Sequence, residues 1–212
     1  MTTTMTSTKL LNLDTNKITL TKNQKFYNIN YEGKKLFVQL KGIKCPFGVS
    51  DYNGNKKFTT TLSVEDDIKT KLDELKNKLI NEVLSNEELS RDIKLKNLSV
   101  EKLDSIFNDV YKDKSDGKYK PLMKINFNND YNDAYKLKCC LIVNKKNLGN
   151  VLPVEQFTQE ISTMSDLDLI LTPLFYCING KNIGVSFKAF AVKVHPRKTQ
   201  HSLTECLFSD EE

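Results

Sequence analysis

Lysine and aromatic side chains alternate over short distances in two stretches of this sequence of 212 residues. An aromatic ring can stack on an unpaired nucleobase, which contributes about 1–3 kcal/mol per base, and a lysine ammonium group binds phosphate oxygens whatever the base beside them. A surface that combines both kinds of side chain therefore suits a single nucleic-acid strand. The candidate DNA-binding residues are Phe37, Lys41, Lys44, Phe47, Tyr52, Lys56, Lys57, Tyr119, Lys120, Lys124, Tyr135, Lys136 and Lys138.

Arginine is scarce, since Arg91 and Arg197 are its only two occurrences. Bidentate contact of arginine with guanine is the commonest specific contact in duplex recognition, so the sequence predicts binding that does not depend on base sequence. A duplex binder would also be expected to carry a basic recognition helix, whereas the helical segment of this chain is acidic.

Charge is unevenly distributed along the chain, whose net charge is +5. Residues 17–57 carry nine lysines against two acidic residues, and residues 111–150 carry nine lysines against four. The last eleven residues hold four acidic side chains and no basic one. Basic stretches attract a polyanion, and an acidic tail competes for the same groove or recruits a basic partner. The candidate partner-binding residues of this tail are Phe208, Asp210, Glu211 and Glu212.

Sequence motifs of enzymes and metal sites are missing. There is no phosphate-binding loop or nucleophile elbow, His195 and His201 are the only histidines, and the five cysteines lack Cys-x-x-Cys spacing. The run Glu65-Asp66-Asp67 could bind a nuclease metal ion, but acidic residues also favour the start of a helix. We therefore predict no enzymatic activity, no cofactor and no metal ion.

No apolar run approaches the roughly 20 residues that span a bilayer, and residues 1–8 lack the features of a signal peptide. Cysteines without a disulfide pattern are typical of a reducing compartment. These features predict an intracellular protein with no membrane partner.

The periodicity of apolar residues predicts a mainly β fold with a helical insertion. Helical spacing of Ile68, Leu72, Leu75, Leu79 and Val83 begins an insertion at about 65–110, between the early and middle strands. Because strands and helices do not alternate, we expect an oligonucleotide-binding (OB)-like Greek-key barrel instead of a parallel sheet. Alternating apolar residues place the strands at 36–43, 57–64, 122–127, 136–143, 168–178 and 183–194.

The predicted organisation is a flexible leader at 1–16, the OB-like domain at 17–198 and the acidic tail at 199–212. Pro173 lies inside a predicted strand, which favours a sheet edge or a bulge there. That edge is a candidate contact for a homodimer.

The arrangement of these segments resembles the single-stranded-DNA-binding proteins of short-tailed phages and of nucleocytoplasmic large DNA viruses. The resemblance covers roughly residues 30–212, and its segments are the stretch from Leu36 through Gly48 to Leu62, the helical insertion, Ile183-Gly184-Val185-Ser186-Phe187 and the acidic end. It implies an OB barrel that binds single strands and a tail, ending in an aromatic residue, that contacts replication partners and competes with DNA. In this chain Phe208 precedes Ser209-Asp210-Glu211-Glu212 instead of ending the sequence.

The sequence thus predicts a non-enzymatic protein that coats single-stranded DNA during viral replication, recombination or repair, in the host cytoplasm (viral factory) or nucleus. Its tail would recruit a polymerase or helicase. The alternatives are a protein-interaction or virion-structural β-barrel whose lysines serve solubility, an RNA binder, and a nuclease that uses residues 65–67.

Overall fold

The structure, a computed structural model, describes residues 7–24, 26–93, 97–113, 119–178 and 182–196. The predicted tail at 199–212, with Phe208, Asp210, Glu211 and Glu212, lies outside these residues. The elements in chain order are β1 (Thr8–Lys9), η1 (Leu10–Asn12), η2 (Thr15–Lys17), β2 (Ile18–Asn23), β3 (Phe26–Tyr31), β4 (Lys34–Lys35), β5 (Val38–Cys45), β6 (Val49–Asp51), β7 (Phe58–Ser63), α1 (Asp66–Ser85), α2 (Glu87–Ile93), α3 (Val100–Ile106), β8 (Phe107–Asn108), β9 (Tyr111–Lys112), β10 (Leu122–Asn126), β11 (Lys136–Val143), β12 (Lys146–Pro153), α4 (Val154–Glu160), β13 (Ser165–Ile178) and β14 (Asn182–Val194).

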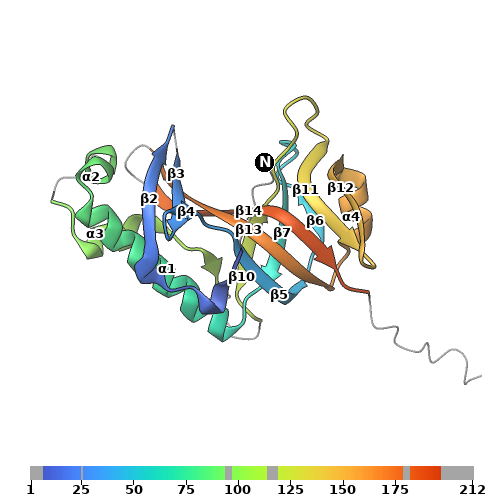
Figure 1. Cartoon of the computed structure of the whole chain (residues 1–212), viewed down its shortest axis with the longest axis horizontal. Helices are drawn as coiled ribbons and strands as arrows, with labels where there is room; N and C mark the ends of the chain where they lie inside the picture. The colour runs from blue at the N-terminus through green and yellow to red at the C-terminus, as the bar shows by residue number, and fades with distance from the viewer. Residues whose placement is uncertain (1–6, 25, 94–96, 114–118, 179–181, 197–212) are drawn as a thin grey trace, which may run out of the picture.

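This order confirms the mainly β fold class, with helices α1 to α3 inserted between the early strand β7 and the middle strand β10. The two long strands β13 and β14 cross the molecule and join its helical half to the half that carries α4 (Figure 1). Along the other edge of β14 lie β8, β10 and β11 in succession, all parallel to it. The sheet runs in the order β1-β5-β13-β14-β10-β7-β6.

The sheet curls, but it is not closed into a barrel. Strands β5 and β7 approach each other where the Cys45 Sγ and Thr60 Oγ1 atoms lie 3.0 Å apart, yet no ladder joins the two strands in the described part of the chain. Strand β7 pairs with β10 along one edge, and along the other edge its residues 58–60 pair with β6, so β5 cannot pair with that part of β7. The strand predicted at 57–64 forms a hairpin with β6, and the strand predicted at 36–43 pairs with β13.

Pro173 lies where the neighbouring strand changes. The ladder of β13 with β5 ends at Leu171, and the ladder with β3 begins at Leu174, whereas the β14 side is paired throughout. Since proline has no N–H to donate, it is tolerated at such an interruption. The predicted edge is therefore local, within a strand that is otherwise central.

Helix α1 forms because apolar residues recur on one of its faces, as the spacing predicts. Ile68, Leu72, Leu75, Leu79 and Val83 are all buried. Asp66 and Asp67 occupy the first turn, where acidic side chains stabilise the helix dipole. No helix in the described ranges is long and apolar enough to cross a membrane.

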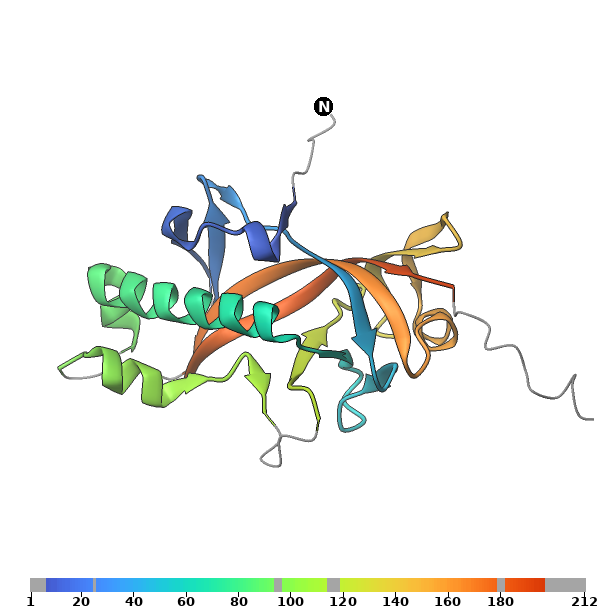
Figure 2. The ribbon, with the colours of Figure 1, turned by 90° about the horizontal axis from the view of Figure 1, so that it is seen from below.

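One continuous core connects the two halves of the molecule. In the helical half Phe175 packs against Tyr27 at 5.9 Å between ring centroids, and in the other half Phe157 of α4 packs against Phe127 at 5.4 Å. Figure 2 shows α1 along one half and α4 at the opposite end. Within the predicted leader, Leu10 and Leu13 are buried in this core.

Gly48 provides a test of this packing. Its φ is +70°, and a Cβ atom there would lie 2.8 Å from the Ile161 carbonyl oxygen, next to α4. We expect Gly48→Ala to lower the free energy of unfolding by about 2–4 kcal/mol, from backbone strain plus overpacking. Gly54→Ala is the matched control, because its φ is +68° but its Cβ meets nothing within 4 Å. If urea unfolding shows the same loss of stability for both variants, the close approach of residue 48 to the Ile161 carbonyl oxygen is unimportant.

Candidate nucleic-acid interface

The outer face of β14 brings cationic and aromatic side chains to the centre of the sheet. Phe187 and Ala189 point into the core, so the alternation of the strand turns Ser186, Lys188 and Phe190 outward. Phe190 is 43% exposed, which is unusual for a phenylalanine of a central strand. The ring is therefore available for contact with a ligand.

A first cluster forms where Phe190 meets the segment between β4 and β5. The rings of Phe37 and Phe190 contact each other edge to face, with centroids 5.3 Å apart. The Nζ atom of Lys35 lies 5.8 Å from the centroid of Phe37, and Lys35 also repels the charge of Lys188. Two rings and two cations thus converge from separate parts of the chain.

A second cluster adjoins the first through β10. Asn126 stands beside Lys188 in the ladder of β10 with β14, and its Nδ2 atom donates to Ser186 Oγ at 3.2 Å. Lys124 lies two residues earlier on the same face of β10, and its Nζ atom sits 3.4 Å from the centroid of the Tyr52 ring. The outer surface is therefore continuous from β14 to the β6–β7 hairpin.

The β6–β7 loop adds a further pair. The Asp51 carboxylate accepts hydrogen bonds from the backbone N–H groups of Lys56 and Lys57, which shapes the loop. Asn129 donates to the carbonyl oxygens of Lys56 and Ala134, and so ties this loop to the segment before β11. As a result the Lys56 Nζ atom lies 4.8 Å from the ring centroid of Tyr135.

We call this surface the basic aromatic face. It crosses the sheet from β5 to β6, or roughly five strand spacings of about 4.8 Å each. Its residues are Lys35, Phe37, Tyr52, Lys56, Lys112, Lys124, Asn126, Tyr135, Ser186, Lys188 and Phe190.

Two lysines of the basic aromatic face have surroundings that disfavour their positive charge. Burial lowers the pKa of Lys124, and the charge of Lys112 lowers it further. Burial likewise lowers the pKa of half-buried Lys188, with Lys35 as the second cause. In the described part of the chain, neither has a carboxylate partner. A bound anion would relieve both costs.

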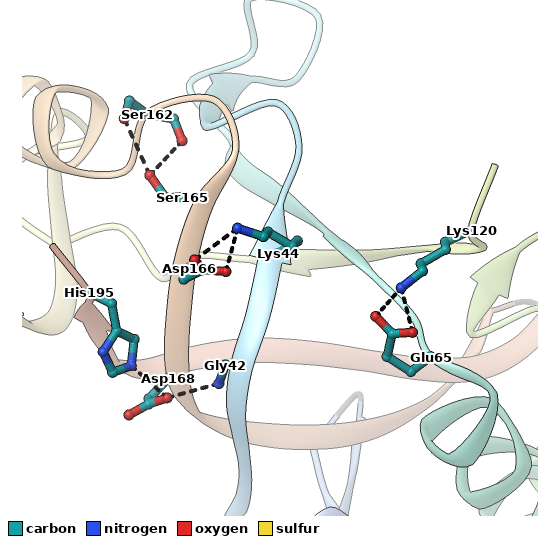
Figure 3. Close-up of polar contacts among 9 residues, drawn as sticks. All are labelled: Gly42, Lys44, Glu65, Lys120, Ser162, Ser165, Asp166, Asp168 and His195. Atoms are coloured by element: carbon teal, nitrogen blue, oxygen red, sulfur yellow. Dashed lines mark hydrogen bonds and ion pairs between the residues drawn. The ribbon is translucent and has the colours of Figure 1, made fainter. Parts of the chain in front are cut away.

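Four of the candidate lysines are paired with carboxylates instead. Lys44 lies 2.8 Å from Asp166, and Lys120 contacts both carboxylate oxygens of Glu65 (Figure 3). Lys138 lies 3.2 Å from an oxygen of Asp130, and Lys136 lies 3.6 Å from Asp133. The hydrogen bond from Lys138 lowers the pKa of Asp130. These lysines offer less free charge to a phosphate.

The other candidates lie apart from the two clusters or at their margin. Lys57 is exposed at the start of β7, and Phe47 is exposed between β5 and β6. Lys41 lines a groove with Leu10 and Ile68, beside the start of α1. Tyr119 is exposed next to Lys120, near that same helix end. The structure therefore brings together Phe37, Tyr52, Lys56, Lys124 and Tyr135 from the predicted set.

Lys188 and Phe190 are not among the residues predicted from the sequence. The signal was present, because Ser186, Lys188 and Phe190 occupy alternate positions of a strand in which every residue between them, and every odd-numbered residue from 183 to 191, is apolar. Lys35 and Lys112 could not be found in this way, since short strands β4 and β9 show no periodicity.

The acidic run at residues 65–67 has structural roles. Glu65 pairs with Lys120, and an oxygen of Asp67 accepts a hydrogen bond from the N–H of Ile68. Over the described ranges, no group of three or more His, Cys, Asp or Glu side chains is placed to hold a metal ion. The acids therefore begin α1.

Asp168 anchors the end of β14 to a bulge in β5. One of its carboxylate oxygens lies 2.9 Å from the N–H of Gly42 and 2.9 Å from Nε2 of His195 (Figure 3). Burial alone would raise the pKa of Asp168, but the contacts with His195 and Gly42 lower it. This network stabilises the sheet on which the basic aromatic face lies.

Comparison with known proteins shows no match to a family model and none to a curated protein sequence. Among solved structures, the chain is similar to the single-stranded DNA-binding protein of bacteriophage Enc34 in complex with single-stranded DNA. The TM-score is 0.49 at 14% identity, and the match covers 85% of this chain and 96% of that one. It is also similar to gp2.5, a single-stranded DNA-binding protein encoded by bacteriophage T7, with a TM-score of 0.40 and 12% identity over 83% and 96% of the two chains.

Both likenesses concern the path of the backbone and do not extend to individual side chains. Both neighbours are single-stranded DNA-binding proteins of bacteriophages. Membership of this chain in the family that its sequence resembles, in phages or in large DNA viruses, stays a prediction.

Proposed function

We propose that this protein binds single-stranded DNA on the basic aromatic face, without enzymatic activity and without reading a long base sequence. The observation that carries the proposal is the placement of Lys124 and Lys188 beside the exposed rings of Tyr52 and Phe190. Both are cations without a carboxylate partner among the described residues. Phosphates would neutralise the cations while bases stack on the rings.

The chemistry of this face favours single strands over duplexes. The rings are presented on a sheet, and stacking requires base faces that a duplex hides. All cations of the face are lysines, which act as point charges and do not make the bidentate contacts by which arginine reads guanine. Binding should therefore depend mainly on phosphate charge and on unpaired bases.

Titration with oligo-dT at several salt concentrations tests the proposal. The logarithm of the affinity should fall linearly with the logarithm of the salt concentration, with a slope of about −0.7 for each phosphate neutralised on a single strand. Tyrosine fluorescence should be quenched in the same titration as bases stack. The absence of oligo-dT binding at low salt would favour the alternative, a protein-interaction or virion-structural module, and tighter binding of a matched RNA strand would favour an RNA binder.

We further propose that the protein coats strands exposed during DNA replication, recombination or repair of a virus, inside the host cell. The acidic residues 199–212 would compete with DNA for the basic aromatic face and recruit a polymerase or helicase. Deletion of residues 202–212 removes four carboxylate side chains. The truncated protein should accordingly bind oligo-dT more tightly at low salt, and unchanged affinity would count against competition by the tail.

A further inference from the structure

A pocket of about 180 Å³ lies next to the basic aromatic face, at the turn between β3 and β4. Two aromatic rings, two lysines and one carboxylate contribute to its lining. This volume is below the about 300–1,000 Å³ of pockets that hold drug-sized ligands, so the pocket suits one small ring system. The residues that line it are Thr8, Tyr31, Glu32, Lys34, Lys35, Leu36 and Phe37.

A tight turn positions the polar groups of this pocket. Glu32 and Gly33 have φ values of +50° and +75°, as in the two-residue turns that join paired strands, and Tyr31 is directly opposite Lys34 in the ladder. The Glu32 carboxylate at the tip is held by Lys17, whose Nζ atom lies 2.6 Å from Oε1. A carboxylate has about four acceptor sites, so this contact leaves most of them free.

The pocket and the basic aromatic face share two residues. Phe37 lines the pocket and also contacts Phe190, and Lys35 lines it and also acts on the charge of Lys188. A strand that stacks on Phe190 and binds Lys188 would therefore pass the mouth of the pocket. The next base along that strand would then meet the other lining residues, Tyr31 and Glu32.

We propose that this pocket takes one base of the bound strand and prefers guanine, an inference that rests on the proposed function. The rings of Tyr31 and Phe37 supply apolar surface for the base, and Lys34 and Lys35 supply positive charge for its phosphates. Glu32 supplies the only carboxylate among the described lining residues.

The preference for guanine follows from the chemistry of that carboxylate. An ionised carboxylate only accepts hydrogen bonds, and guanine presents two neighbouring donors, N1–H and the N2 amino group, on one edge. Thymine presents a single N–H between two carbonyl oxygens, which a carboxylate repels. A base that donates two charge-assisted hydrogen bonds should thus displace thymine from the pocket.

The test uses the full chain and a set of oligo-dT strands just long enough for one protein, each with a single dG at a different position. We expect one position, or two neighbouring ones, at which dG raises the affinity about tenfold over plain oligo-dT. Glu32→Gln should abolish this difference while still binding plain oligo-dT at least as tightly as the wild type, which shows that the variant is folded. Glu155→Gln, an equal charge change at an exposed position of α4, should keep the preference.

The outcomes separate the two proposals. If the wild type binds every strand equally whatever the position of dG, or if Glu32→Gln keeps the preference, the pocket does not select guanine although the protein binds DNA. If the wild type binds none of the strands, the proposed function itself fails and the pocket proposal fails with it.

Discussion

Replacement of both Lys124 and Lys188 by glutamine is expected to weaken oligo-dT binding about 30–100-fold at low salt. Each substitution would remove a charge-assisted contact with a phosphate. Neither ammonium group has to leave a carboxylate partner within the described ranges before it makes that contact. The salt dependence should also become shallower by about 1.4 in slope, which corresponds to two phosphates. Fluorescence titration at three or more salt concentrations measures both effects.

The matched control is the double variant Lys44→Gln with Lys120→Gln, which removes the same charge. These lysines already pair with Asp166 and Glu65, so the control should retain most of the affinity and most of the slope. If both double variants lose affinity equally, binding reflects net charge alone and the basic aromatic face has no special role.

Phe190→Ala is expected to weaken oligo-dT binding about tenfold, because stacking of one base on an aromatic ring contributes about 1–3 kcal/mol. The ring carries no charge, so the slope of affinity against salt concentration should stay as in the wild type. This combination separates loss of stacking from loss of phosphate contacts. The same titration measures it.

Phe26→Ala serves as the control for Phe190→Ala. Phe26 is similarly exposed, at 47%, but belongs to β3 and pairs with Tyr176, outside the basic aromatic face. Its removal should leave DNA binding unchanged. Normal binding by the Phe190 variant would mean that this ring does not stack on a base, and the face would have to be redrawn around Tyr52 and Tyr135.

Part of the candidate site could be predicted from the sequence, because side chains alternate between the two faces of a strand whatever its neighbours are. Lys124 was expected to point outward from the alternation of its neighbours, and it does. Its contact with Tyr52 was not expected, because the two residues are 72 positions apart and meet only through the pairing of β10 with β7. Likewise, charge counts could not distinguish Lys44, which has Asp166 as a partner, from Lys56, which has no carboxylate partner in the described part of the chain.

The sequence by itself determined the mainly β class and the helical insertion. It also determined which strand side chains point into the core, among them Val38, Leu40 and Ile125. Backbone sterics and burial of apolar side chains act between near neighbours, so their period can be read directly. Only the tertiary structure decided that β6 takes the edge of β7 and leaves the sheet open, and that Lys188 and Phe190 lie at the centre of the face. Such contacts depend on the pairing and register of distant strands, for which no local pattern in the chain gives a signal.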